Sequence, residues 1–280
     1  MSTADAAFAE RYGPWALVAG ASEGVGAAFA HAVAARGLGV VLLSRRQAAL
    51  DDVAAGIRAD TGVDTRAVAV DLAGPDAVAK VLEATAGLEI GLLMYCAGAD
   101  PNYEPFLASS VDVALAMVHR NCIVPMELCH HFGGSMVARG RGGMILVSSG
   151  AALVGARNMV AYAATKAFDM VMAEALWAEL HDDGVDVLGL VLGLTDTPAL
   201  RQLLVRRGNL ASADDATPIP GAATAAQVAA DALEHLADGP TWFVGDELRA
   251  GAQALGSMAR SDAVKVMIEH GAGIMDTDLR

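Results

Sequence analysis

The sequence is poor in cysteine and in basic side chains. Its 280 residues include three cysteines. That number is too small for a disulfide framework, which favours a reduced, cytoplasmic setting. The 19 lysines and arginines are outnumbered by 33 aspartates and glutamates, giving a formal net charge of −14 at pH 7. This charge argues against nucleic acid and anionic membrane surfaces as partners, because both attract basic proteins.

The sequence also lacks a long apolar segment. Residues 142–156, a stretch without a charged residue that no other in the chain exceeds in length, are too few and too rich in glycine to span a bilayer. The first 15 residues have no basic start followed by an apolar core, so we expect no signal peptide.

Short apolar runs alternate with helical stretches along most of the chain. Most of these runs have five to eight residues, as in a parallel sheet that is buried on both faces. The pattern predicts an α/β fold in a single domain over residues 1–280, with a doubly wound, Rossmann-like parallel sheet of about seven strands and helices on both faces. The expected strands are residues 15–20, 39–44, 65–70, 90–95, 143–148, 185–192 and 241–244. The expected helices are residues 25–36, 47–61, 77–85, 111–138, 161–182 and 227–236.

Two segments stand outside this alternation. Residues 200–221 are polar and contain arginines, aspartates and prolines, which indicates a lid-like insertion. Residues 245–280 follow the last expected strand as a C-terminal extension, and we expect two short helices in it.

A glycine-rich loop, GASEGVG at residues 20–26, joins the first expected strand to the first expected helix. Gly20 permits a tight turn, Gly24 lets the backbone approach a pyrophosphate, and Gly26 allows close packing of helix and strand. The start of the helix supplies unpaired N–H groups and the positive end of its dipole. An ordinary glycine-rich turn is the alternative interpretation.

The spacing of these glycines resembles the G-x-x-x-G-x-G loop of the short-chain dehydrogenase/reductase superfamily. The resemblance covers roughly residues 15–244 and is greatest to the branch of 3-oxoacyl and 17-ketosteroid reductases. It implies that the loop binds a nicotinamide dinucleotide. The loop residues it assigns to the cofactor are Gly20, Ser22, Glu23, Gly24, Val25 and Gly26.

A Tyr-x-x-x-Lys motif, YAATK, supplies Tyr162 and Lys166. Four residues apart on a helix, the two side chains share one face. A lysine ammonium beside a phenol favours the phenolate, which suits proton transfer to or from an alcohol oxygen. A surface pair on a helix is the alternative. The resemblance implies that both residues are catalytic and that both also contact the cofactor.

The resemblance implies two further catalytic residues. Ser149 lies thirteen residues before Tyr162 at the end of the fifth expected strand, where its hydroxyl would bind the reacting carbonyl. Asn121 lies in the long expected helix, where the family's asparagine bends the helix and holds a water that links the lysine to solvent. A buried asparagine without a catalytic role is the alternative for Asn121.

Other segments resemble the family in part. Tyr95 and Cys96 replace the two asparagines of the family's N-N-A-G, so the bracing of the central strands must come from elsewhere. Leu192 replaces a proline. The remaining residues that the resemblance assigns to the cofactor are Asp71, Leu72, Ala97, Gly98, Gly193, Thr195 and Thr197.

The second expected strand ends in Ser44, Arg45 and Arg46, without an acidic residue. An acidic residue here would bind the ribose 2′-hydroxyl of NAD, whereas an arginine accommodates the 2′-phosphate of NADP. We therefore expect NADP(H) to be preferred, with Arg45 as the main contact. Binding of NAD(H) stays open, and at least one of the two arginines is expected to be a solvated residue at a helix start. Glu23 cannot help to bind the 2′-phosphate.

The combined features predict an NADP(H)-dependent enzyme that interconverts a ketone and a secondary alcohol on a lipophilic or acyl substrate. The alternatives are a dehydrogenase that oxidises a hydroxylated metabolite with NAD(P) and a non-catalytic dinucleotide sensor. No metal is expected, because Cys122, Cys129, His130 and His131 fit helix packing better than a ligand set. Residues 161–180 are apolar enough for a second buried face. The resemblance implies that this helix and the expected helix at residues 111–138 pair across a dimer axis, in a homodimer or homotetramer. A single, unusually buried helix is the alternative.

Overall fold

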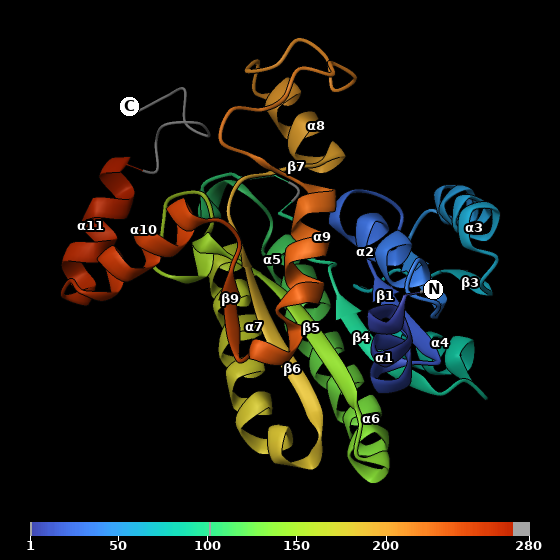
Figure 1. Ribbon diagram of the computed structural model, residues 1–280. Helices are drawn as coiled ribbons and strands as arrows, with labels where there is room; N and C mark the ends of the chain where they lie inside the picture. The colour runs from blue at the N-terminus through green and yellow to red at the C-terminus, as the bar shows by residue number, and fades with distance from the viewer. Residues whose placement is uncertain (1, 101, 271–280) are drawn as a thin grey trace.

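The centre of the structure, a computed structural model that describes residues 2–100 and 102–270, is a parallel sheet of seven strands (Figure 1). The strands lie in the order β3-β2-β1-β4-β5-β6-β9. The chain runs outward from β1 to β3 and then crosses back to β4 on the other side of β1. This confirms the predicted doubly wound fold, and the strand order reverses between β1 and β4, the position at whose carboxyl ends folds of this class bind ligands. The strands are β1 (Trp15–Ala19), β2 (Gly39–Ser44), β3 (Thr65–Ala69), β4 (Ile90–Tyr95), β5 (Gly142–Ser149), β6 (Val185–Leu192) and β9 (Thr241–Phe243).

Helices cover both faces of this sheet. Buried apolar side chains from α2, α3 and α9 pack on one face, and those from α4, α6 and α7 pack on the other. Figure 1 shows α8 beyond the end of the sheet, and α10 and α11 standing out to one side. The helices are α1 (Thr3–Tyr12), α2 (Gly24–Ala34), α3 (Gln47–Thr61), α4 (Ala77–Thr85), α5 (Val111–Val118), α6 (Val124–Arg139), α7 (Val160–Leu180), α8 (Pro198–Arg206), α9 (Ala225–Glu234), α10 (Asp246–Gly256) and α11 (Arg260–His270).

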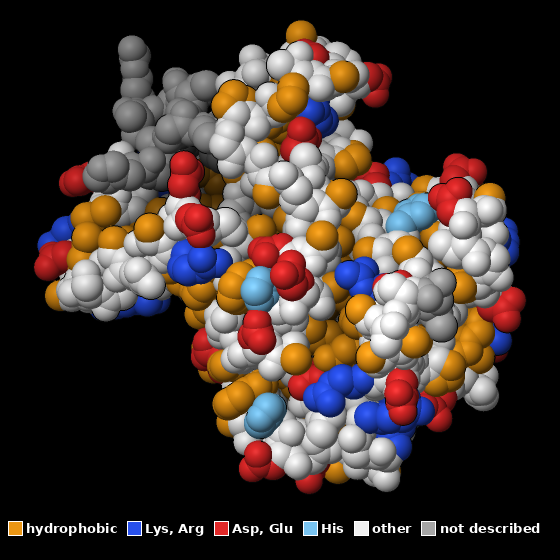
Figure 2. Space-filling model, viewed as in Figure 1, with side chains coloured by type: hydrophobic (Ala, Val, Ile, Leu, Met, Phe, Trp, Pro, Cys, Tyr) orange, Lys and Arg blue, Asp and Glu red, His pale blue; other side chains and the backbone are white. Residues whose placement is uncertain are grey.

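Charged side chains of both signs are mixed on one face of the molecule. On the face shown in Figure 2, lysine and arginine side chains lie among aspartates and glutamates rather than in one large basic patch.

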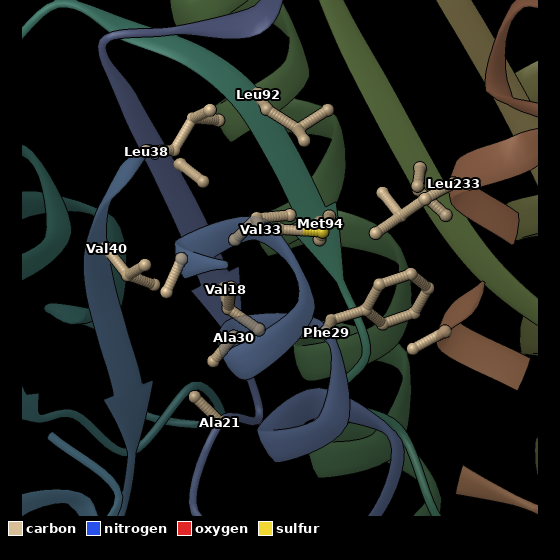
Figure 3. Packing of buried hydrophobic residues seen from close by; sticks show 14 of the residues in the cluster. Val18, Ala21, Phe29, Ala30, Val33, Leu38, Val40, Leu92, Met94 and Leu233 are labelled. Atoms are coloured by element: carbon tan, nitrogen blue, oxygen red, sulfur yellow. The ribbon is translucent and has the colours of Figure 1, made fainter. Parts of the chain in front are cut away.

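The core between the sheet and α2 fixes the position of the glycine-rich loop. Successive side chains of a strand point to opposite faces, so Val18 and Met94 join the core beneath α2, and Leu17 joins the other core. Figure 3 shows Phe29 and Val33 of α2 packed over these strands. Phe29 is fully buried, which stabilises the fold by about 1.5–3 kcal/mol relative to an exposed side chain. α2 is thus held close to β1, and the loop between them has little freedom.

Helix α1, which was not among the expected helices, packs at the amino ends of the strands. Its Arg11 donates hydrogen bonds to both carboxylate oxygens of Asp186 on β6, at 2.5 and 2.8 Å. The hydroxyl of Tyr12 donates to the same carboxylate at 2.6 Å, and burial raises the pKa of Tyr12 above its usual value. α1 thus covers this end of the sheet, and the carboxyl end remains for a site.

The predicted ranges of β2, β4, β6, α3 and α4 agree with the structure, and most other elements differ by one or two residues at an end. The expected long helix at residues 111–138 is interrupted by a π-helical turn, His119–Ile123, which separates α5 from α6. The predicted lid-like insertion at residues 200–221 begins inside α8. Two short strands, β7 (Thr195–Asp196) and β8 (Ala223–Thr224), pair at the base of this segment.

The two short helices expected in the C-terminal extension are confirmed as α10 and α11. The end of the extension, residues 271–280, lies outside the described residues.

Candidate active site

The residues of the predicted site meet where the central strands end. Gly20 follows β1, Gly98 lies just beyond β4, Ser149 ends β5 and Gly193 follows β6. Because the strands are parallel, these four positions lie along one edge of the sheet. α7, which carries Tyr162 and Lys166, packs against β5 and β6.

The glycine-rich loop leaves no room for side chains at two of its glycines. Gly20 has φ of +90°, and a Cβ there would lie 3.0 Å from the backbone nitrogen of Ala97. A Cβ on Gly26 would lie 2.2 Å from the carbonyl oxygen of Gly20. Glu23 is the N-cap residue of α2, yet its side chain makes no capping hydrogen bond. The first N–H groups of α2 are therefore available to an anion, and the loop fits a dinucleotide pyrophosphate.

The Glu23 carboxylate forms an ion pair with Arg46, with the two side chains 33% and 55% exposed. Arg46 also donates a long hydrogen bond to Ser22 Oγ, at 3.4 Å. Arg45, by contrast, is exposed and makes no hydrogen bond or ion pair with any residue that the structure describes. Of the two arginines at the end of β2, Arg46 has an acidic partner, whereas Arg45 can meet a phosphate directly.

Lys166 is fixed from the buried side of the site. Its Nζ donates hydrogen bonds to the carbonyl oxygen of Val147, at 2.7 Å, and to Oδ2 of Asp169, at 3.0 Å. Ser148 Oγ donates to the carbonyl oxygen of Lys166 at 2.7 Å, which ties α7 to β5. Tyr162 is half-buried one helical turn earlier, and its hydroxyl makes no hydrogen bond with the rest of the described chain. This hydroxyl is thus available to a ligand.

The hydroxyl oxygen of Ser149 already accepts one hydrogen bond from the chain. Its Oγ accepts a hydrogen bond from the backbone nitrogen of Ala151 at 3.2 Å, just after β5. A serine hydroxyl has one O–H donor in addition to its lone pairs. This contact orients the hydroxyl, whose O–H can donate a hydrogen bond to an oxygen atom of a bound molecule.

Asn121 lies in the π-helical turn and is fully buried. Its Nδ2 donates to Thr165 Oγ1 at 2.9 Å and to the carbonyl oxygen of Gly98 at 3.3 Å. Its Oδ1 accepts a hydrogen bond from Arg120 Nε at 3.0 Å. Asn121 therefore joins the turn to α7 and to the segment after β4.

Tyr95, which replaces the first asparagine of N-N-A-G, ties the end of β4 to the π-helical turn. Its buried hydroxyl donates a hydrogen bond to the carbonyl oxygen of Arg120, next to Asn121. Burial raises the pKa of Tyr95 well above its usual value, so the hydroxyl stays a donor. Burial likewise raises the pKa of Cys96 to about 12, which keeps the thiol protonated at neutral pH.

The remaining predicted cofactor residues occupy the same edge of the sheet. Asp71 is exposed, and its Oδ1 accepts a hydrogen bond from the backbone nitrogen of Ala73 at 3.1 Å. Thr195 Oγ1 donates to the carbonyl oxygen of Gly193 at 3.2 Å. Thr197 caps α8. Three further predicted cofactor residues differ in exposure: Leu72 is buried, and Val25 and Ala97 are partly buried.

Asp169 is a site residue that the sequence analysis missed. It is 2% exposed and lies three residues after Lys166 on the same helix. The signal was present in the sequence, because a single aspartate between apolar residues at this spacing faces the lysine. Burial raises the pKa of Asp169, and the Lys166 ammonium opposes that rise.

Within residues 2–100 and 102–270, the structure contains no group of three or more His, Cys, Asp or Glu side chains that could hold a metal ion. None of the helices in those residues is both long enough and apolar enough to pass through a lipid bilayer.

Comparison with known proteins gives consistent relatives. The family model of the short chain dehydrogenases matches residues 14–207. A 7beta-hydroxysteroid dehydrogenase of Collinsella aerofaciens is 37% identical over 191 residues, 68% of this chain and 72% of that protein. One of Clostridium sardiniense is 32% identical over 261 residues, 92% of this chain and 95% of that one. Human very-long-chain 3-oxoacyl-CoA reductase is 33% identical over 178 residues, 62% of this chain and 57% of the human enzyme.

Solved structures agree with these relatives. A structure from a study of 7beta-hydroxysteroid dehydrogenase stereoselectivity has a TM-score of 0.84 at 30% identity, covering 92% of this chain and 98% of that chain. A short-chain dehydrogenase from Sphingobium yanoikuyae in complex with NADPH has a TM-score of 0.73 at 26% identity, covering 88% and 96% of the two chains.

Proposed function

Since the chain belongs to the short-chain dehydrogenase family and is an oxidoreductase acting on alcohol and carbonyl groups, we propose that it is an NADP(H)-dependent reductase of a lipophilic ketone. The observation that carries this proposal is the meeting of Ser149, Tyr162 and Lys166 at the carboxyl edge of the sheet, beside a loop that fits a pyrophosphate.

The chain's own residues would handle the proton and the orientation of the carbonyl. When bound, the nicotinamide cofactor supplies the hydride. The hydroxyl of Tyr162 donates its proton to the carbonyl oxygen as an alcohol forms. Ser149, oriented by the Ala151 N–H, donates a hydrogen bond to the same oxygen and stabilises its developing charge.

Lys166 and Asn121 would support this chemistry without contacting the carbonyl group themselves. Lys166 holds a positive charge next to Tyr162 and would bind the ribose of the nicotinamide half. Asn121, fully buried, would hold the π-helical turn against α7 and support the path of the proton from solvent. The full set of catalytic residues in this proposal is Asn121, Ser149, Tyr162 and Lys166.

For the cofactor, we favour NADP(H) with Arg45 as the main contact of the 2′-phosphate. Arg45 is exposed at the end of β2 and has no acidic partner in the described chain. Support also comes from the Sphingobium structure, which contains NADPH. Turnover with NADH as efficient as with NADPH would contradict this assignment.

For the substrate, we propose a hydroxysteroid or oxosteroid. Two of its relatives are named 7beta-hydroxysteroid dehydrogenases, and an apolar side chain lies at the ends of two strands that carry the candidate site. Leu248 of α10 packs near Gly150 and Gly193, so a helix of the C-terminal extension reaches the ends of β5 and β6. Phe106 and Leu107, in the segment between β4 and α5, are exposed. A 3-oxoacyl thioester is the second candidate, supported by the human relative.

A substrate panel tests the proposal directly. Oxosteroids, 3-oxoacyl thioesters and small aromatic ketones are each offered with NADPH and with NADH, and the matching alcohols with NADP and NAD. We expect the highest kcat/KM for an oxosteroid with NADPH. A preference for the thioesters would favour the second candidate, and rates only in the oxidative direction would favour a dehydrogenase of a hydroxylated metabolite. NADPH binding without turnover of any of these would contradict the assignment.

We also propose that the chain works as a homo-oligomer. α5 and α7 contact each other, and several apolar side chains on and beside them are exposed. These residues are Val111, Leu115, Val118, Val160 and Val171. A second copy of the chain would cover them. Light scattering that gives the mass of a single chain at micromolar concentration would contradict this proposal.

A cytoplasmic location fits the cysteines. Cys96, Cys122 and Cys129 are all free thiols, as expected of a protein that works in a reduced compartment. Fractionation of cells that express the chain would test this location.

A further inference from the structure

Asp169 is a buried carboxylate beside the active-site lysine, and half of it is unpaired. Its Oδ2 accepts the hydrogen bond from Lys166 Nζ at 3.0 Å, and both side chains are less than 5% exposed. Its Oδ1 has no hydrogen-bond partner among the described residues. A buried carboxylate of this kind costs free energy, because pairing with a lysine does not fully offset the loss of water. The cost suggests a role other than stability.

Asp169 and two backbone segments together fix the position of the Lys166 Nζ atom. An ammonium has three N–H donors, and the Lys166 Nζ gives two of them to Asp169 and to the carbonyl oxygen of Val147. A Cβ on Gly98 would lie 2.8 Å from the same Nζ, so the backbone beyond β4 closes around the lysine tip. The third donor remains for a ligand or for Tyr162.

The charge of Asp169 reaches several groups around the pair. Burial is the main cause of the raised pKa of Tyr95 on β4, of Cys122 in the π-helical turn and of Cys129 on α6, and the Asp169 carboxylate adds to each rise. Lys166 acts in the opposite direction on Cys96. Tyr95, Cys122, Cys129 and Lys166 are thus titratable side chains of the described chain that lie close enough to Asp169 to interact with its charge. The field at the site is thus set by the lysine and the carboxylate together.

We propose that Asp169 is a positioning residue that holds Lys166 and offsets part of its charge, so that Tyr162 keeps its proton at neutral pH and carbonyl reduction is favoured. This inference rests on the proposed function. In reduction the tyrosine must be a phenol that donates a proton, whereas in oxidation it must be a phenolate that accepts one. A lysine without a counter-ion would favour the phenolate, and a carboxylate 3.0 Å from its Nζ weakens that effect.

The variant Asp169→Asn tests the charge while keeping the shape and an acceptor oxygen for Lys166. We expect the pH profiles of kcat/KM, for ketone reduction and for alcohol oxidation, to move toward lower pH by about one unit. Oxidation then gains rate on the acid side, and reduction loses rate on the alkaline side. Glu179→Gln is the matched control, because it removes the same charge from an exposed position ten residues further along α7, about 15 Å away. The control should leave both profiles in place.

A second measurement needs neither substrate nor cofactor. The chain has four tyrosines, so the difference in phenolate absorbance between a protein and its Tyr162→Phe form reports on Tyr162 alone. We expect this difference to develop at lower pH in the Asp169→Asn background than in the wild-type background. Asp169→Ser, which removes the same charge and leaves space for a water, replaces the first variant if that one does not fold.

The outcomes separate this inference from the proposed function. An unchanged titration, or one displaced to higher pH, overturns the role of Asp169 even if the wild-type enzyme reduces oxosteroids. A titration displaced to lower pH supports that role even if no compound of the substrate panel is turned over, a result that would contradict the proposed function alone.

Discussion

Two ends of the site, the catalytic end proposed around Lys166 and the adenosine end proposed around Arg45, are held together by different kinds of contact. The side chains of Asn121 and Lys166 are buried and donate hydrogen bonds to backbone carbonyls and to neighbouring side chains. Glu23 and Arg46 instead form an ion pair that water reaches. Removing one partner of a buried hydrogen bond costs about 1–3 kcal/mol, whereas an exposed ion pair contributes about 0–1 kcal/mol. The catalytic end is therefore preorganised, and the adenosine end can rearrange around a ligand.

The largest effect is expected at the catalytic end, from Tyr162→Phe. Removing the hydroxyl takes away the proposed proton donor, so kcat should fall by about 10²- to 10⁴-fold. The half-buried ring remains, so NADPH affinity and melting temperature should stay close to the wild-type values. Steady-state kinetics and NADPH titration by fluorescence measure the two quantities. Activity within tenfold of wild type, with binding intact, would assign the proton transfer to another group.

At the adenosine end, Arg45→Ala should weaken NADPH binding and leave NADH binding nearly unchanged. A hydrogen bond to a charged group contributes about 1.5–3 kcal/mol, so we expect NADPH affinity to fall by about ten- to a hundredfold. Arg46→Ala is the matched control, because Glu23 already pairs with that arginine. A larger loss of NADPH affinity in Arg46→Ala than in Arg45→Ala would transfer the main role to Arg46.

The motif proposed to be catalytic could be read from the sequence because its information is local. The spacing of Tyr162 and Lys166 places both on one face of a helix whatever surrounds them, and the strand that ends at Ser149 is recognisable from its apolar residues. The loop at residues 20–26 could be read for the same reason, since glycines between a strand and a helix have few other uses.

The contacts of Tyr95, Glu23 and Asp169 depend instead on packing between distant segments or on burial. Tyr95 donates to Arg120, 25 residues away, and only because a π-helical turn brings that carbonyl near β4. Glu23 meets Arg46 because β1 and β2 are neighbours in the sheet. Asp169 lies only three residues after Lys166, but the role proposed for it depends on the burial of both side chains. A single sequence fixes none of these conditions.

The hydroxyl of Tyr95 offers a test of how firmly the catalytic end is held. Tyr95→Phe removes the hydrogen bond to the Arg120 carbonyl and should lower the free energy of unfolding by about 1–3 kcal/mol. Because Arg120 adjoins Asn121, we expect kcat to fall as well, while NADPH affinity changes little. Chemical denaturation and steady-state kinetics measure these effects. A fall in stability with kcat unchanged would mean that the π-helical turn keeps Asn121 in place without Tyr95.

The smallest effect, and the sharpest contrast with the buried end, is expected from Glu23→Gln. The substitution removes the charge that pairs with Arg46, and because that pair is exposed, stability should change by less than about 0.5 kcal/mol. Arg46 then becomes available to the 2′-phosphate beside Arg45, so NADPH should bind about two- to fivefold more tightly while NADH binding stays the same. Glu23→Lys should extend this gain, and high salt should reduce it, because exposed charges are screened. Weaker NADPH binding in Glu23→Gln would mean that the carboxylate organises the loop through Arg46, and the adenosine end would then be as preorganised as the catalytic end.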